Sequence, residues 1–136
     1  MNVRLTQEQK IKVLNSDDVY GVMQRILLRE NKIKRNKEHF WIVGLNIQNK
    51  ILFIELMSVD GVEVEPSDVF RIAILKMAKK IILVQNHSSD NITPSSNDKE
   101  LTSSIKEAGR IVKIRVVEHL LISEKKYLSF VNEKLL

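Results

Sequence analysis

The chain has 136 residues, of which 43% are hydrophobic and 29% charged, a composition typical of one soluble globular domain. It contains no cysteine, so disulfides and thiolate ligands are excluded, and any metal site must use His, Asp, Glu and water. The formal net charge of +5 permits a nucleic-acid or acidic partner without requiring one, because lysine-rich surfaces without such a partner are common.

Segments that would direct the chain to a membrane are not found in the sequence. No apolar run approaches the roughly 18–20 residues that span a bilayer, and the N-terminus lacks the apolar core of a secretion signal. We therefore expect no membrane contact and a cytoplasmic location. Residues 1–136 are expected to form a single domain, in which residues 1–15 carry little pattern.

The first regular element is predicted to be a helix over residues 16–30. Ser16 suits an N-cap, two aspartates follow where the helix dipole favours them, and apolar residues then recur at helical spacing. Residues 31–37 follow as a basic connector. We interpret this connector as a solvated segment, or alternatively as a patch that contacts phosphate or an acidic partner.

A β-hairpin over residues 40–59 comes next, because two strand-like runs flank the turn-forming residues 46–50. Pro66 then begins a helix whose apolar positions predict the range 66–79. The near-continuous apolar run that opens residues 81–86 is typical of a strand buried on both faces of a sheet.

The last third of the chain predicts one more helix and three strands. Pro94 and Ser95 open a helix over residues 95–109, and Gly109 is expected to end it. The predicted strands cover 111–117, 120–123 and 127–130, and residues 131–136 are expected to be a strand end or a frayed tail. This order predicts the α/β (α+β) class, with a mixed central β-sheet flanked by helices.

The richest candidate for a site is the polar stretch that follows the predicted central strand. In α/β domains, sites are commonly built on the loop beyond a strand's carboxyl end. His87 and Asp98 stand eleven positions apart across that loop, a spacing that could place both on one metal, and Gln85 lies on the same side of the extended chain as His87. By residue type alone, His87 also suits a hydrogen-bonded structural histidine, Glu38 a solvated residue, and Ser95 with Asp98 a helix cap.

The sequence here resembles the RadC family, whose domain has the JAMM (MPN-plus) metalloprotease fold. The family pattern is H-N-H-P-S-G-D-x-T-P-S-x-x-D, and residues 85–98 read Q-N-H-S-S-D-N-I-T-P-S-S-N-D. Residues 38–46 and 108–122 are similar to two further family motifs, so the resemblance covers about residues 16–130. It implies a JAMM/MPN-like, cytidine-deaminase-like architecture. The helix-hairpin-helix module often found in the family is not expected within these 136 residues.

The resemblance also implies roles for individual residues. In the family, two histidines and an aspartate hold a zinc ion that activates a water, and a glutamate takes the proton of that water. Carried over, Glu38 is the general base, His87 and Asp98 are zinc ligands, and Ser95 is the oxyanion donor. Gln85 stands at the position of the first ligand histidine.

Departures from the family pattern predict an impaired metal site. A glutamine oxygen is a weaker zinc ligand than an imidazole nitrogen, so both zinc binding and peptidase activity are expected to suffer. Ser88 and Asp90 replace a proline and a glycine, which predicts a less restrained loop, and Ser67 replaces an arginine. The other two histidines, His39 and His119, are the remaining candidates for the missing ligand.

Three functions therefore stay open. The first is a weakened zinc-dependent peptidase or isopeptidase that acts on a peptide or protein. The second is a catalytically inactive interaction module. The third is a DNA-associated accessory protein, as the family's DNA-repair label implies. The substrate and the partner stay unknown from the sequence.

Overall fold

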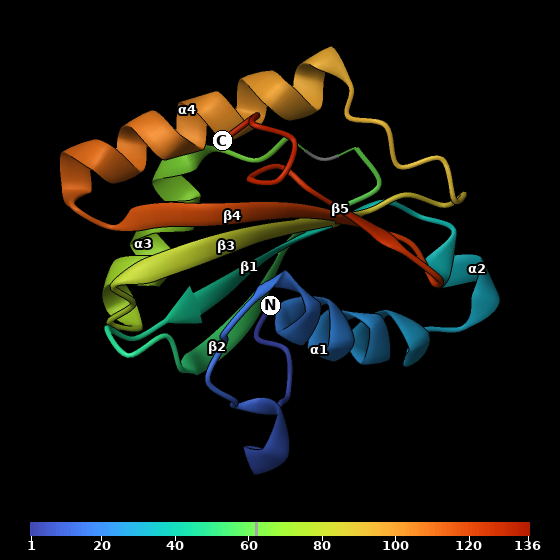
Figure 1. The fold of residues 1–136 in the computed structure, drawn as a ribbon, viewed down its shortest axis with the longest axis horizontal. Helices are drawn as coiled ribbons and strands as arrows, with labels where there is room; N and C mark the ends of the chain where they lie inside the picture. The colour runs from blue at the N-terminus through green and yellow to red at the C-terminus, as the bar shows by residue number, and fades with distance from the viewer. Residues whose placement is uncertain (62) are drawn as a thin grey trace.

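The computed structural model describes residues 1–61 and 63–136. Five strands form one sheet in the order β2-β1-β3-β4-β5, and Figure 1 shows α1 on one face of this sheet and α3 with α4 on the other. The strands are β1 (His39–Leu45), β2 (Ile51–Val59), β3 (Lys80–Asn86), β4 (Arg115–Ile122) and β5 (Tyr127–Ser129). The helices are α1 (Ser16–Leu28), α2 (Lys32–Arg35), α3 (Pro66–Leu75) and α4 (Ser96–Val112), with a short 3-10 helix at Gln7–Gln9. The predicted fold class, a mixed sheet flanked by helices, is confirmed.

The sheet is mixed because β3 pairs antiparallel with β1 and parallel with β4. The hairpin predicted over residues 40–59 is present as β1 and β2, and the predicted buried strand is β3, at the centre of the sheet. Since parallel strands end at the same edge, the carboxyl ends of β3 and β4 lie side by side there. Among the residues that the structure describes, no helix is long and apolar enough to cross a membrane.

Side-chain alternation along β3 divides the core into two layers. Ile82 and Val84 pack in the cluster that contains α1, whereas Ile81 and Leu83 pack in the cluster that contains α3 and α4. Because successive side chains of a strand point to opposite faces, Gln85 continues the set that faces α4. The strand therefore delivers Gln85 to the α4 layer at the edge where β3 ends.

The predicted stop of the last helix at Gly109 is wrong. Helix α4 continues to Val112 and ends where Lys113 adopts a left-handed conformation, with φ of 62°. Gly109 has a packing role instead, because a Cβ there would lie 2.5 Å from the Ile114 carbonyl oxygen and 3.0 Å from the Phe70 ring. The strand expected from residue 111 consequently starts later, and the two expected strands are one continuous strand, β4.

Other boundaries also differ from the sequence-based expectation. Helices α1 and α3 end at Leu28 and Leu75, earlier than predicted, and the basic connector contains the one-turn helix α2. The weakly patterned first residues form two isolated bridges, from Asn2 to Glu55 of β2 and from Lys12 to Lys50, the residue before β2. The C-terminal tail is not frayed, because the backbone N–H of Leu135 donates to the carbonyl of the buried Phe130.

Candidate functional site

The loop of residues 87–95 joins β3 to α4 at the edge where β3 and β4 end. The backbone N–H of His87 donates to the Ile122 carbonyl at 2.9 Å, so pairing with β4 continues one residue beyond β3. The His87 ring lies 3.0 Å from the Asn91 carbonyl through Nδ1 and 3.7 Å from Asp98 Oδ2 through Nε2. With a proton on Nδ1, the His87 ring donates a hydrogen bond to the Asn91 carbonyl oxygen. Its other nitrogen, Nε2, then faces Asp98.

Asp98 is held by the cap of α4. The Asp98 backbone N–H donates to Ser95 Oγ at 3.0 Å, and Asp98 Oδ2 accepts from the Ser95 backbone N–H at 2.9 Å. This reciprocal pair is a capping box, which satisfies two backbone donors at the helix start. Ser95 is thus the N-cap residue of α4, and its cap turns the Asp98 carboxylate toward the end of β3.

His87 and Asp98 shift each other's protonation in opposite directions. The Asp98 carboxylate raises the pKa of His87 above its usual value, against burial, which lowers it. Burial would raise the pKa of Asp98, but the His87 ring and the Ser95 N–H and hydroxyl outweigh it and lower that pKa to about 2. The carboxylate therefore favours the protonated form of His87, and the His87 ring favours the ionised form of Asp98.

Gln85 completes this group through its amide nitrogen. Its Nε2 donates to Asp98 Oδ1 at 3.4 Å, and its Oε1 is buried with no hydrogen-bond partner among the described residues. The reverse orientation would place the amide oxygen, an acceptor, against the carboxylate, which is also an acceptor. The hydrogen bond to Asp98 therefore fixes the Gln85 amide with its N–H group toward the carboxylate. A metal ligand at this position would have to present the oxygen.

The residues present do not fit a zinc site with three strong ligands. His87 and Asp98 supply an imidazole and a carboxylate, but the third position offers an N–H, and both Asp98 oxygens already accept hydrogen bonds. In the described part of the chain, no three His, Cys, Asp or Glu side chains converge as a metal-holding group. A neutral amide is a weak zinc ligand even when its oxygen is available.

Among the described residues, neither of the other histidines forms a metal-holding group with His87 and Asp98. The His39 ring stacks on Trp41 at 5.1 Å between centroids, and its Nδ1 lies 2.8 Å from the Lys37 carbonyl. The His119 ring stacks on Phe130 at 4.2 Å, and its Nδ1 lies 2.6 Å from the Thr102 hydroxyl. Burial lowers the pKa of His119 to about 3, which keeps this ring neutral. Both rings are buried in the core, and Nε2 of His119 has no hydrogen-bond partner among the described residues.

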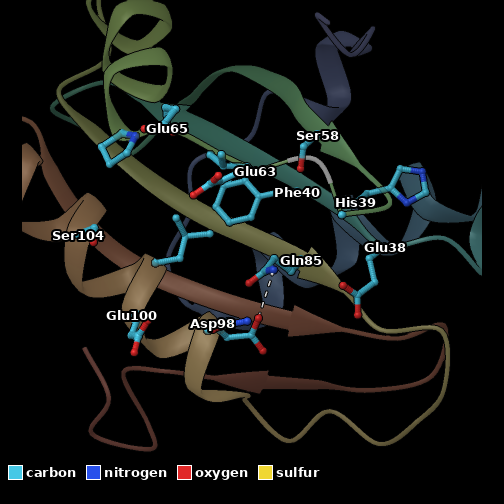
Figure 2. Close-up of a pocket in the computed structure, with 15 residues that line it drawn as sticks. Glu38, His39, Phe40, Ser58, Glu63, Glu65, Gln85, Asp98, Glu100 and Ser104 are labelled. Atoms are coloured by element: carbon cyan, nitrogen blue, oxygen red, sulfur yellow. Dashed lines mark hydrogen bonds between the residues drawn. The ribbon is translucent and has the colours of Figure 1, made fainter.

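Glu38 reaches the group from the segment just before β1. It lines a cavity of about 640 Å³ together with Gln85 and Asp98, and Figure 2 shows Asp98 below Gln85 and Glu38 to one side of them. Its negative charge also contributes to the raised pKa of His87. The structure thus brings Gln85, His87, Ser95 and Asp98 into one contact group, with Glu38 beside it. The roles assigned to these residues by the family resemblance stay predictions.

Asn86 is a site residue that the sequence-based reasoning did not single out. It is fully buried, its Oδ1 accepts from the His39 backbone N–H at 2.5 Å, and its Nδ2 donates to the carbonyls of Arg35 and Lys37 at 3.2 and 3.0 Å. These bonds tie the segment that carries Glu38 to the end of β3. A signal was present in the sequence, because a polar residue buried at a strand end needs hydrogen-bond partners.

The loop of residues 87–95 is anchored by the side chain of Asp90, which stands where the family pattern has glycine. Asp90 accepts a hydrogen bond from the Ser123 hydroxyl at 2.7 Å, which ties the loop to the end of β4. The Asn91 side chain accepts from the Thr93 hydroxyl at 2.9 Å, while its carbonyl faces His87. Asp90, which replaces the glycine of the family pattern, thus holds the loop to the end of β4. The expectation of a less restrained loop did not include this contact.

Comparison with known proteins matches the sequence of this chain to one family. The profile of the RadC-like JAB domain matches residues 13–135. The chain belongs to the RadC-like JAB domain family. Three similar relatives are UPF0758 proteins from Caldanaerobacter subterraneus subsp. tengcongensis, Flavobacterium johnsoniae and Chlorobium chlorochromatii, at 39%, 35% and 31% identity. The matches cover 91%, 90% and 100% of this chain but 52%, 52% and 61% of those relatives. This RadC-like chain thus spans little more than half the length of these curated relatives.

Proposed function

We propose that this RadC-like JAB domain binds a peptide or protein segment in the Glu38-lined cavity, with a metal site too impaired for efficient zinc-dependent hydrolysis. The observation that carries the proposal is the Gln85 amide, which presents an N–H to Asp98 where the family pattern has a ligand histidine. Two strong ligands seldom hold zinc tightly without a third in a preformed cage. The cavity, in contrast, is of a size that suits a ligand or peptide segment.

A weak zinc-dependent peptidase or isopeptidase is the alternative within the same family. It is supported by the His87–Asp98 pair at 3.7 Å and by Glu38, a carboxylate that lines the same cavity as Asp98 and is of the type that serves as a general base. Under this alternative, His87 and Asp98 would hold the metal, Ser95 would stabilise the oxyanion, and the metal would supply an activated water.

A DNA-associated role, as the RadC label suggests, is the remaining candidate. It is favoured by the net charge of +5 and by the short helix α2, whose Lys32 and Lys34 are exposed. A Lys32→Gln/Lys34→Gln variant tests it by electrophoretic mobility shift on duplex DNA across a salt series. Weaker binding and a smaller salt slope than the wild type would support DNA contact at α2. A cytoplasmic location would accompany any of the three roles.

A zinc competition titration tests the main proposal. The apo protein is titrated with zinc against a chromophoric chelator, for the wild type and for Gln85→His. We expect weak or undetectable zinc binding in the wild type and a gain in Gln85→His larger than the roughly 10–100-fold typical of outer-shell changes. Gln48→His, on the exposed β1–β2 turn, is the matched control and should change nothing. Tight stoichiometric zinc in the wild type, without a gain on substitution, would show the proposal to be wrong.

A further inference from the structure

We infer that the Glu38-lined cavity selects a cationic segment, one that places a lysine or arginine side chain between its carboxylates. This inference rests on the proposed function only in that the cavity binds a peptide segment. It names the chemistry of that segment. The binding step that it describes requires no metal.

The charge of the cavity is opposite to the charge of the chain. The whole sequence has 22 Lys and Arg residues against 17 Asp and Glu residues, yet the described residues that line the cavity include five carboxylates and no Lys or Arg. These carboxylates are Glu38, Glu63, Glu65, Asp98 and Glu100. Like charges gathered around a hollow focus a negative potential into it, which attracts a cation.

The carboxylates come from three separate segments that the fold brings around one opening. Glu38 precedes β1, Glu63 and Glu65 lie in the β2–α3 connection, and Asp98 and Glu100 lie in the first turns of α4 (Figure 2). Among the described residues, Glu38, Glu63, Glu65 and Glu100 form no ion pair with a basic side chain. Their charge is therefore available to a ligand.

The apolar part of the lining indicates an organic cation in preference to a metal ion. Phe40, Val64 and Leu101 contribute to the wall of the cavity beside the carboxylates. Lysine and arginine pair an apolar stem with a charged end, so the stem can lie along such a wall while the charge meets a carboxylate. The carboxylates do not converge with other ligands on one point, as a metal would require.

Gln85 supplies an independent indication that a hydrogen-bond donor is missing. Its Oε1 is buried and has no partner in the described part of the chain, although the residue lines the same cavity. Buried polar atoms without a partner are uncommon because they lose hydration without compensation. An ammonium or guanidinium group carries several donors and no acceptor, which matches the five carboxylates of the lining.

The test is metal-free calorimetry with three matched peptides. The probe acetyl-Ala-Lys-Ala-Arg-Ala-amide is compared with versions that carry Gln or Glu at both charged positions, in EDTA-containing buffer of low ionic strength. The variant Glu63→Gln/Glu65→Gln/Glu100→Gln removes three charges without touching Glu38 or Asp98. The control Glu8→Gln/Glu30→Gln/Glu133→Gln removes the same number of charges from residues that do not line the cavity. Circular dichroism checks that both variants fold.

We expect the wild type to prefer the Lys/Arg peptide over the Gln peptide and the Glu peptide to bind weakest. The cavity variant should weaken binding of the Lys/Arg peptide by roughly tenfold, and the control variant much less, because distant exposed charges are screened. A Glu65→Lys/Glu100→Lys variant should shift preference toward the Glu peptide. Equal binding of the Lys/Arg and Gln peptides, or equal losses in both triple variants, would overturn the inference. Tight zinc in the wild type would contradict the impaired metal site and leave this cation preference intact.

Discussion

The side-chain amide of Gln85 donates a hydrogen bond to Oδ1 of Asp98 across 3.4 Å. This contact joins the end of β3 directly to the first turn of α4, between residues that the RadC pattern would join through a zinc ion. The amide thus maintains the closure of the site by a hydrogen bond between neutral donor and charged acceptor. Both residues also line the cavity that contains Glu38.

The His87–Asp98 pair predicts a window of pH in which it stabilises the fold. The Asp98 pKa of about 2 lies below its ordinary 3.8, so its contribution is present above pH 3.8 and is lost as pH falls toward 2. The His87 pKa is raised above 6.5, so its contribution is present below pH 6.5 and is lost as pH rises through the folded pKa.

Asp98→Asn should therefore lower the free energy of unfolding most between pH 3.8 and 6.5, by about 1–2 kcal/mol. Urea unfolding at a series of pH values measures this difference. Asp60→Asn, at an exposed turn whose left-handed backbone tolerates asparagine, is the control. A pH-independent effect of Asp98→Asn would argue that only its capping role matters.

Asn86→Ala should destabilise the fold through the segment that carries Glu38. The substitution leaves the His39 N–H and two carbonyls without their buried partner, which should cost about 2–4 kcal/mol in urea unfolding. The exposed Asn36→Ala is the matched control. Hydrogen exchange should speed up at the His39 amide in particular, and unchanged protection there would contradict the anchoring role.

Gly109→Ala and Gly21→Ala should have opposite effects although both glycines lie inside helices. A Cβ at Gly109 would lie 2.5 Å from the Ile114 carbonyl oxygen, so backbone must shift, and we expect a loss of about 1–3 kcal/mol. A Cβ at Gly21 meets nothing within 4 Å, so the better helix propensity of alanine should stabilise α1 by up to about 1 kcal/mol. Thermal unfolding of the two variants measures both effects, and equal shifts would show that packing at Gly109 is not decisive.

His119 should make the protein sensitive to acid. Burial lowers its pKa to about 3, so from pH 6.5 downward the unfolded chain binds a proton that the folded chain excludes, and stability falls until about pH 3. His119→Phe removes this proton uptake and should flatten the fall in unfolding free energy over that range. Nuclear magnetic resonance of the wild type should show no His119 titration between pH 4 and pH 8, and a midpoint inside that range would contradict the prediction.

The local pattern of apolar residues in the sequence was sufficient to predict much of the fold. Helices and strands were predictable because apolar residues recur with the period of each element, and the buried run of β3 located the centre of the sheet. The boundary at Gly109 was not predictable, because a glycine that ends a helix and a glycine that permits close packing look alike until Phe70 and Ile114 are placed against it.

The candidate site was likewise predictable from the sequence only in part. The family pattern identified Glu38, Gln85, His87, Ser95 and Asp98 from the sequence, because such motifs keep their residue types and spacing along the chain. Only the tertiary structure decided that Gln85 turns its donor to Asp98, that Asn86 anchors the Glu38 segment, and that five carboxylates surround one cavity. These relationships join residues far apart in the chain, and their directions depend on which side chains and backbone groups meet across the fold.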